Sequence, residues 1–217
     1  MKQIALGIAA LALSAVSAGA AVFDNPYDTT RGNDATRWVQ SSEFSLDSDT
    51  VLTGGSVYIA GLGGIGAWDG TFNYWIFNDD GGTPGSIETS GSDSTVSSID
   101  TGDTWFGGGN VFELQFDLTN SFSATGGDSY WLGVQLSSDF ARDDIYWVNS
   151  SNSGASAQSE DGSFDNWFTY TPARAFSLEG TTRDVFGATP APVPLPASGI
   201  LLVVGLGVLA GKRRRAA

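Results

Sequence analysis

VFELQFDL, residues 111–118, alternates between apolar and polar side chains after its first valine. Each even-numbered residue is Phe or Leu, and the odd-numbered residues between them are Glu, Gln and Asp. Because successive side chains of a β-strand point to opposite faces, this period of two is typical of a strand with one buried face. The stretch therefore predicts a half-buried strand of an antiparallel sheet.

Similar stretches recur along the chain and predict an all-β body. Tyr130–Leu136 repeats the alternation, and Phe72–Phe77 has large residues on both faces, so we expect it to be covered on both sides. The other expected strands are Trp38–Leu46, Val51–Ala60, Thr95–Ile99, Ile145–Val148, Trp167–Tyr170 and Ala175–Leu178. About nine short strands without a helical stripe between them favour an antiparallel two-sheet sandwich, jelly-roll-like or immunoglobulin-like.

Two polar segments between these strands are expected to be turns or loops. Residues 79–85 are DDGGTPG, in which Gly81 and Gly82 allow positive φ, so a sharp exposed bend is predicted. Residues 150–162 are rich in Ser, Asn and Gly and predict a loop.

The composition excludes several classes of function. All 24 acidic residues lie between Asp24 and Asp184, together with five arginines, so this body has a formal charge of −19. Such a charge repels nucleic acid and anionic lipid, and nucleic acid is not an expected partner. The chain has no Cys and no His, which removes disulfides, the usual transition-metal ligands and the common Ser-His and Cys-His catalytic pairs.

The N-terminal 20 residues have the layout of a secretory signal peptide. Lys2 precedes an apolar segment, Ile4–Val16, and small residues follow at Ala18 and Ala20. We expect signal peptidase to cleave after Ala20. A second transmembrane helix is the alternative, but the apolar segment is short for that role and a cleavage site follows it.

The C-terminal sequence has three parts in a fixed order. A proline motif comes first, followed by the apolar run Gly199–Gly211 and then by four cations. The motif residues are Val193, Pro194, Leu195, Pro196 and Ala197, and the cations are Lys212, Arg213, Arg214 and Arg215. The 17 residues Leu195–Gly211 predict a short transmembrane helix, about 25 Å long against a core of about 30 Å. The basic tail favours the cytoplasmic side, so the body is expected outside the cytoplasm.

This end of the chain resembles the PEP-CTERM class of bacterial sorting signals, in its VPLPA variant. The resemblance implies a protein exported by a Gram-negative bacterium, held in the inner membrane by one span, and recognised by an exosortase at Val193–Ala197. It then implies delivery to the cell surface or extracellular matrix. An ordinary single-pass tail anchor remains the alternative, although such an anchor needs no proline motif and favours a longer helix.

A second resemblance concerns the body. The order of EFSL at residues 43–46, Val51–Ile59, FNDDGGTPG at residues 77–85 and DSYWLGV at residues 128–134 is similar to that of β-sandwich ectodomains found in front of bacterial surface-sorting signals. The expected organisation is thus a signal peptide (1–20), a β-sandwich ectodomain (21–180), an extended linker (181–192) and the sorting region (193–217).

Acidic residues give two candidate chemistries. A pair of carboxylates across a groove would serve a glycosidase, but no pair stands out in the sequence. Calcium binding by loop carboxylates is the other use, although the spaced Asp pattern of a calcium loop is absent. The calcium candidates are Asp79, Asp80, Asp139, Asp143 and Asp144. No other cofactor is expected.

Seven tryptophans are many for this length, and exposed aromatic faces can stack on sugar rings. Trp68 and Trp105 lie beside glycine-rich loops, so we expect these two to face solvent and to be candidate ligand-binding residues; the others are expected in the core.

The sequence predicts three functions, in order of preference. They are a non-catalytic surface or matrix protein associated with exopolysaccharide, a carbohydrate-binding module that could be assisted by calcium, and a secreted carboxylate glycosidase.

Overall fold

The computed structural model describes residues 20–62, 64–93, 95–160 and 162–183. The signal-peptide residues before Ala20, most of the linker and the sorting region lie outside these residues, as does the expected helix at 195–211. By its contacts the chain divides into two units, 1–183 and 184–217, and only the first contains described residues. Within the described part, no helix is long and apolar enough to cross a membrane.

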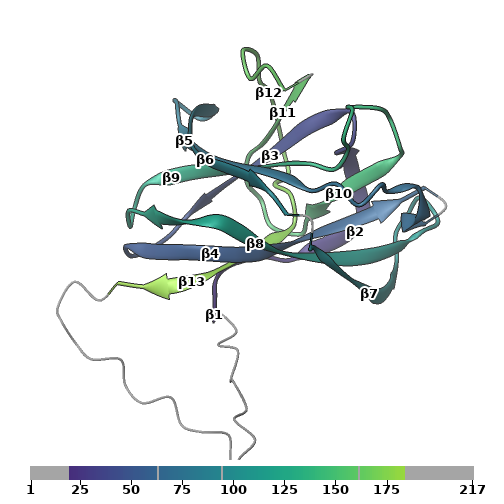
Figure 1. Cartoon of the computed structure of the whole chain (residues 1–217), viewed down its shortest axis with the longest axis horizontal. Helices are drawn as coiled ribbons and strands as arrows, with labels where there is room; N and C mark the ends of the chain where they lie inside the picture. Colours follow the sequence, from purple (N-terminus) through teal and green to yellow (C-terminus); the bar gives the residue numbers. More distant parts are fainter. Residues whose placement is uncertain (1–19, 63, 94, 161, 184–217) are drawn as a thin grey trace, which may run out of the picture. The chain divides into compact units, whose positions relative to one another are not determined.

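Two antiparallel sheets form this unit, one above the other in Figure 1. The seven-stranded sheet contains β1 (Ala20–Asn25), β2 (Tyr27–Asp34), β4 (Thr50–Gly61), β7 (Ser97–Thr104), β8 (Asn110–Ala124), β10 (Ile145–Ser150) and β13 (Phe176–Thr182). The six-stranded sheet, in the order β12-β11-β3-β9-β5-β6, contains β3 (Trp38–Ser45), β5 (Asn73–Asp79), β6 (Pro84–Ser92), β9 (Ser129–Gln135), β11 (Ser156–Glu160) and β12 (Phe168–Tyr170). A short 3-10 helix, η1 (Ile65–Ala67), follows β4. The prediction of an all-β, two-sheet antiparallel sandwich is confirmed.

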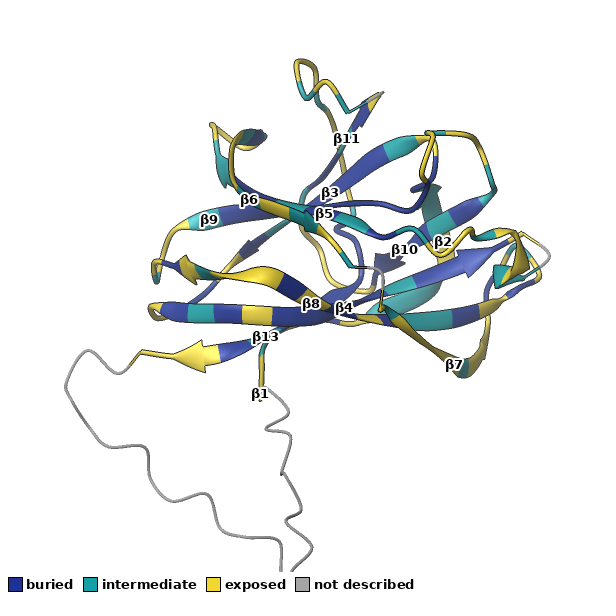
Figure 2. Cartoon of the chain, viewed as in Figure 1, coloured by how far each residue is buried: buried dark blue, intermediate teal, exposed yellow. Residues whose placement is uncertain are grey.

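The main core contains the inward faces of strands from both sheets. In β8, Leu114 is fully buried, and Phe116 and Leu118 are at most 8% exposed, as the alternation at 111–118 predicts. In β9, Tyr130 and Leu132 join the same cluster. Buried residues concentrate in β3, β4, β9 and β10, whereas β6 and β7 are largely exposed (Figure 2).

β5 is covered on both faces, as expected. Tyr74 and Ile76 belong to the main core. Phe77 lies in a second cluster on the outer face of the six-stranded sheet, where Phe164 and Trp167 pack against it with ring centroids 5.2 and 5.3 Å away. The segment between β11 and β12 therefore supplies an aromatic cover for the sheet.

The prediction that residues 150–162 form a loop is wrong in part. Strand β11 occupies Ser156–Glu160 and pairs with both β3 and β12, inside the six-stranded sheet. Its sequence, SAQSE, lacks large apolar residues, so the alternation that marks the other inner strands is missing. Its buried hydroxyls are satisfied by hydrogen bonds instead, and Ser156 Oγ donates to the carbonyl of Pro172 at 2.9 Å.

The first and last described strands are neighbours. β1 pairs with β13 antiparallel, and Ala20 lies opposite Gly180. The start of β1 and the end of β13 therefore lie at the same end of the seven-stranded sheet (Figure 1).

Candidate functional site

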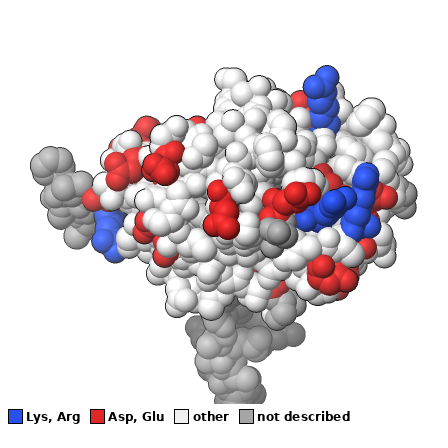
Figure 3. Space-filling view, turned by 90° about the horizontal axis from the view of Figure 1, so that it is seen from above, with Lys and Arg blue, Asp and Glu red and all other residues white. Residues whose placement is uncertain are grey.

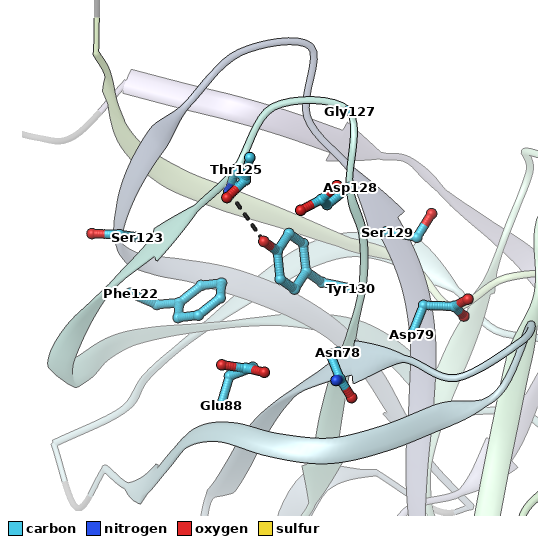
Figure 4. Close-up of a pocket in the computed structure, with 10 residues that line it drawn as sticks. All are labelled: Asn78, Asp79, Glu88, Phe122, Ser123, Thr125, Gly127, Asp128, Ser129 and Tyr130. Atoms are coloured by element: carbon cyan, nitrogen blue, oxygen red, sulfur yellow. Dashed lines mark hydrogen bonds between the residues drawn. The ribbon is translucent and has the colours of Figure 1, made fainter.

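A groove of about 600 Å³ opens at one end of the sandwich, where β5, β6, β8 and β9 meet (Figure 4). We call it the end groove. Its lining residues are Asn78, Asp79, Glu88, Phe122, Ser123, Thr125, Gly127, Asp128, Ser129 and Tyr130. They include three carboxylates, two aromatic rings and three hydroxyl side chains, and no Lys or Arg is among them. This lining suits a polar ligand that carries hydrogen-bond donors.

The β5–β6 turn shapes one wall of the end groove. Gly81 and Gly82 have φ of 65° and 88°, which only glycine adopts easily, and the expected bend at 79–85 is present. Asp79 Oδ1 accepts hydrogen bonds from Trp131 Nε1 at 2.8 Å and from the Gly82 amide at 3.2 Å. The Gly82 amide also donates to Asp79 Oδ2, at 3.1 Å, so both oxygens of Asp79 help to hold the turn against β9.

The β8–β9 turn shapes the opposite wall. Its Gly127 has φ of 87°, and the Gly127 amide donates to the carbonyl of Leu46 at 2.7 Å. Tyr130 Oη accepts from the Thr125 amide at 3.1 Å, the bond that Figure 4 marks with a dashed line. The ring of Phe122 meets that of Tyr130 edge-on, with centroids 5.2 Å apart. These contacts hold an apolar surface next to the polar rim.

Two of the three carboxylates of the end groove make no interaction with other described residues. Within the described part of the chain, the side chains of Glu88 and Asp128 accept no hydrogen bond and join no ion pair. Asn78 Oδ1 is shielded from solvent and also lacks a hydrogen-bond partner there. The end groove thus has a surplus of hydrogen-bond acceptors.

The prediction that Trp105 faces solvent is wrong, because Trp105 is 3% exposed. Its ring packs against Tyr146, with centroids 5.1 Å apart, and lies directly over Gly107. A Cβ at Gly107 would come within 2.1 Å of this ring, so the glycine is needed for the packing. Trp105 therefore belongs to a small cluster on the outer face of the seven-stranded sheet.

The exposed aromatic residue at this turn is Phe106, at 76%. Adjacent residues of an extended chain point to opposite sides, and the sequence alone does not decide which of the two is buried.

Trp68 is half-buried against the main core, and its Nε1 donates to the carbonyl of Thr71 at 2.9 Å. Of the other five tryptophans, Trp131 and Trp147 are fully buried; the remaining ones, Trp38, Trp75 and Trp167, are half-buried.

The calcium candidates occupy two separate segments. Asp79 and Asp80 lie at the β5–β6 turn, whereas the others lie between β9 and β10. Asp139 accepts hydrogen bonds from Ser137 Oγ and the Ala141 amide, the Asp143 amide donates to Thr36 Oγ1, and Asp144 pairs with Arg142 at 2.9 Å. Among the described residues, no three acidic side chains gather closely enough to hold a metal ion.

On the face that Figure 3 shows, the acidic residues are spread over the surface rather than gathered in one patch. Beside the Trp105 cluster, a hydrogen bond to Asp103, together with burial, raises the pKa of Tyr27. Burial also raises the pKa of Tyr58 and of Tyr146. These phenols are therefore neutral at physiological pH, and Tyr27 and Tyr146 donate hydrogen bonds to Asp103 and Asp144.

No protein-family model matches this chain, and no curated protein matches it. The functional argument therefore rests on the residues themselves and on the geometry of the end groove.

Proposed function

We propose that this chain is an exported, exosortase-sorted protein of the cell surface or extracellular matrix, without catalytic activity, that associates with exopolysaccharide. The observation that carries the proposal is the order of VPLPA, apolar run and basic tail at residues 193–215. Signal peptidase, an exosortase and the inner membrane are its partners on this proposal, and Gram-negative export is its route. The proposal also includes a helix at each terminus of the chain and a jelly-roll-like or immunoglobulin-like topology for the sandwich.

The limits of the strands support this organisation. β1 begins at Ala20, where the signal peptide is expected to end, and β13 ends at Thr182, where the linker is expected to begin. The end of β13 lies beside the end groove, because the guanidinium of Arg183 donates to Ser123 Oγ, one of the lining residues, at 3.3 Å.

The test replaces Pro194 and Pro196 with Ala in an exosortase-bearing Gram-negative host. Intact mass of the protein recovered from the envelope reports both termini at once. We expect loss of residues 1–20 in all variants, and loss of C-terminal processing only in the Pro194→Ala/Pro196→Ala variant. The matched control is Pro190→Ala/Pro192→Ala in the linker, which should be processed normally. Normal processing of the motif variant would contradict the sorting proposal and favour a plain anchor.

Carbohydrate binding is the second candidate function, and the end groove favours it. The groove combines free carboxylates with hydroxyl groups and an aromatic wall, which are the groups that recognise sugar hydroxyls and ring faces. A glycan array separates this candidate from a purely structural role. Turnover of a polysaccharide that is lost with a single Asp→Asn change would instead favour a glycosidase, the third candidate.

A further inference from the structure

We propose that the end groove binds amino-sugar residues that carry a free ammonium group, in oligosaccharides or polysaccharides. This inference deepens the carbohydrate-binding candidate by naming the site and the chemical class of ligand. It assigns recognition to Glu88 and Asp128, with Asp79, Phe122 and Tyr130 as supporting residues. The two tryptophans singled out from the sequence have no part in it.

The charge of the lining residues determines which sign of charge a ligand can carry. Asp79, Glu88 and Asp128 all line the end groove, and no basic residue does. Glu88 and Asp128 have no hydrogen bond or ion pair of their own within the described residues. The guanidinium of Arg183 reaches the rim, where it donates to Ser123 Oγ at 3.3 Å, but it forms no ion pair with either carboxylate. An anionic sugar would be repelled here, whereas an ammonium group would form a charge-assisted hydrogen bond with either carboxylate.

The spread of these groups argues for an organic cation rather than a metal ion. A bound metal needs several oxygens that converge on one point. Among the described residues no such group of acidic side chains occurs. Asp79, Glu88 and Asp128 instead come from different strands or turns around a groove of about 600 Å³. A ligand of extended shape can satisfy separated acceptors.

The remaining lining groups favour a sugar over other cations. Ser123, Thr125 and Ser129 bring hydroxyl groups to the rim, where they can exchange hydrogen bonds with sugar hydroxyls. The half-buried ring of Phe122 provides an apolar surface for the C–H face of a sugar ring, and the buried ring of Tyr130 supports it from behind. A pyranose that carries an ammonium group presents all three features in one unit, namely positive charge, hydroxyls and an apolar face.

The experiment measures binding of glucosamine oligomers to the purified full chain in a polyoxyethylene detergent, which has no sugar head group. The N-acetylated oligomers of equal length serve as the neutral ligand. Titration calorimetry at about 0.15 M NaCl screens long-range attraction beyond about 8 Å. We expect binding of the free-amine oligomers and binding at least tenfold weaker for the acetylated ones.

Two double variants with the same change in charge locate the site. Glu88→Gln/Asp128→Asn removes the free carboxylates of the end groove, and we expect it to weaken binding about tenfold or more. The control, Glu160→Gln/Asp165→Asn, removes two acidic residues that do not line the groove and should change affinity less than twofold. Neither groove carboxylate accepts a hydrogen bond in the described structure, and Glu160 has only an exposed ion pair with Arg37 at 3.7 Å, which contributes little to stability. Both variants should therefore keep a melting temperature close to that of the wild type.

Several outcomes would overturn the proposal. Equal weakening by both double variants would mean that the ligand responds to the total negative charge only. Equal affinity for acetylated and free-amine oligomers would remove the role of the ammonium group. Oligolysine of matched charge serves as a further ligand. If Glu88→Gln/Asp128→Asn weakens its binding as much as that of the glucosamine oligomers, the ligand would be a basic peptide. The sorting proposal is unaffected by these outcomes, because binding is measured on purified chain and sorting on processed mass.

Discussion

At the scale of single residues, Arg174 is the least expected feature. Its side chain is 1% exposed, and within the described residues no carboxylate forms a salt bridge with it. The guanidinium donates to Asn149 Oδ1 and, at 3.3 Å, to Gln40 Oε1. Nε has no partner there. Burial lowers the pKa of Arg174 to about 10, so the core holds a cation at a cost in solvation.

We predict that Arg174→Ala lowers the free energy of unfolding by about 3 kcal/mol, because it leaves a cavity and two buried acceptors without donors. Arg174→Met keeps most of the volume and removes the buried charge, so it should lose less than half as much. Urea unfolding of both variants measures the difference. Equal losses in the two variants would show that the hydrogen bonds, rather than the volume, account for the contribution of Arg174.

At the scale of elements, the centre of the seven-stranded sheet depends on a glycine pair. β4 is flanked by β8 and β13, and a Cβ at Gly54 or Gly55 would lie within 2.5 Å of a backbone carbonyl oxygen of the neighbouring strand. These positions allow the three backbones to approach closely. Larger residues here would force two strands apart.

Gly55→Ala is therefore expected to destabilise the protein by about 2 kcal/mol or more, because its Cβ would lie 2.3 Å from the carbonyl oxygen of Ser177. The control is Gly66→Ala in η1, where nothing lies within 4 Å of the added Cβ. Thermal unfolding of the two variants makes the comparison. A melting temperature for Gly55→Ala equal to that of the control would contradict the close approach of β4 and β13.

The strands that the sequence predicts are those with large alternating side chains. All nine expected stretches contain strands, with shifted boundaries. Four strands were not expected, and their composition explains this. β2 and β6 are mostly polar edge strands, β11 contains mainly small residues, and β1 starts at Ala20, the last residue of the expected signal peptide. In these strands pairing with neighbours, rather than a local pattern, determines the conformation.

The end groove could be predicted only in fragments. The bend at 79–85 and the inward position of Tyr130 follow from turn chemistry and alternation. Glu88 lies on β6, a strand without a clear sequence signal, and Asp128 lies in the β8–β9 turn. Their meeting depends on the pairing of β9 with β5 and of β5 with β6. β5 and β6 form a hairpin around the predicted bend, whereas β9 is distant from β5 in sequence, and a pairing of that kind has no local signature.

At the scale of the whole molecule, the formal charge of −19 between Asp24 and Asp184 opposes compaction. We predict that raising NaCl from 10 to 200 mM increases the melting temperature by about 2–5 °C, since the screening length falls from about 30 Å to below 10 Å. At about pH 4 many carboxylates of this body are protonated, so the same change in salt should have a smaller effect there than at pH 7. A salt response that is equal at both pH values would contradict a charge-repulsion origin.

The pairing of β1 with β13 has a mechanical consequence. Since the start of one strand lies beside the end of the other, opposite forces applied at these two points act across the strand pair rather than along it. After cleavage behind Ala20 the first pair is Ala21 and Glu179, and the hydrogen bonds then break in succession from that pair instead of sharing the load. Tension between the two ends of this unit is therefore expected to separate β1 from β13 at low force. The centre of the sheet, where Gly54 and Gly55 of β4 allow close packing of the strands, is expected to stay intact.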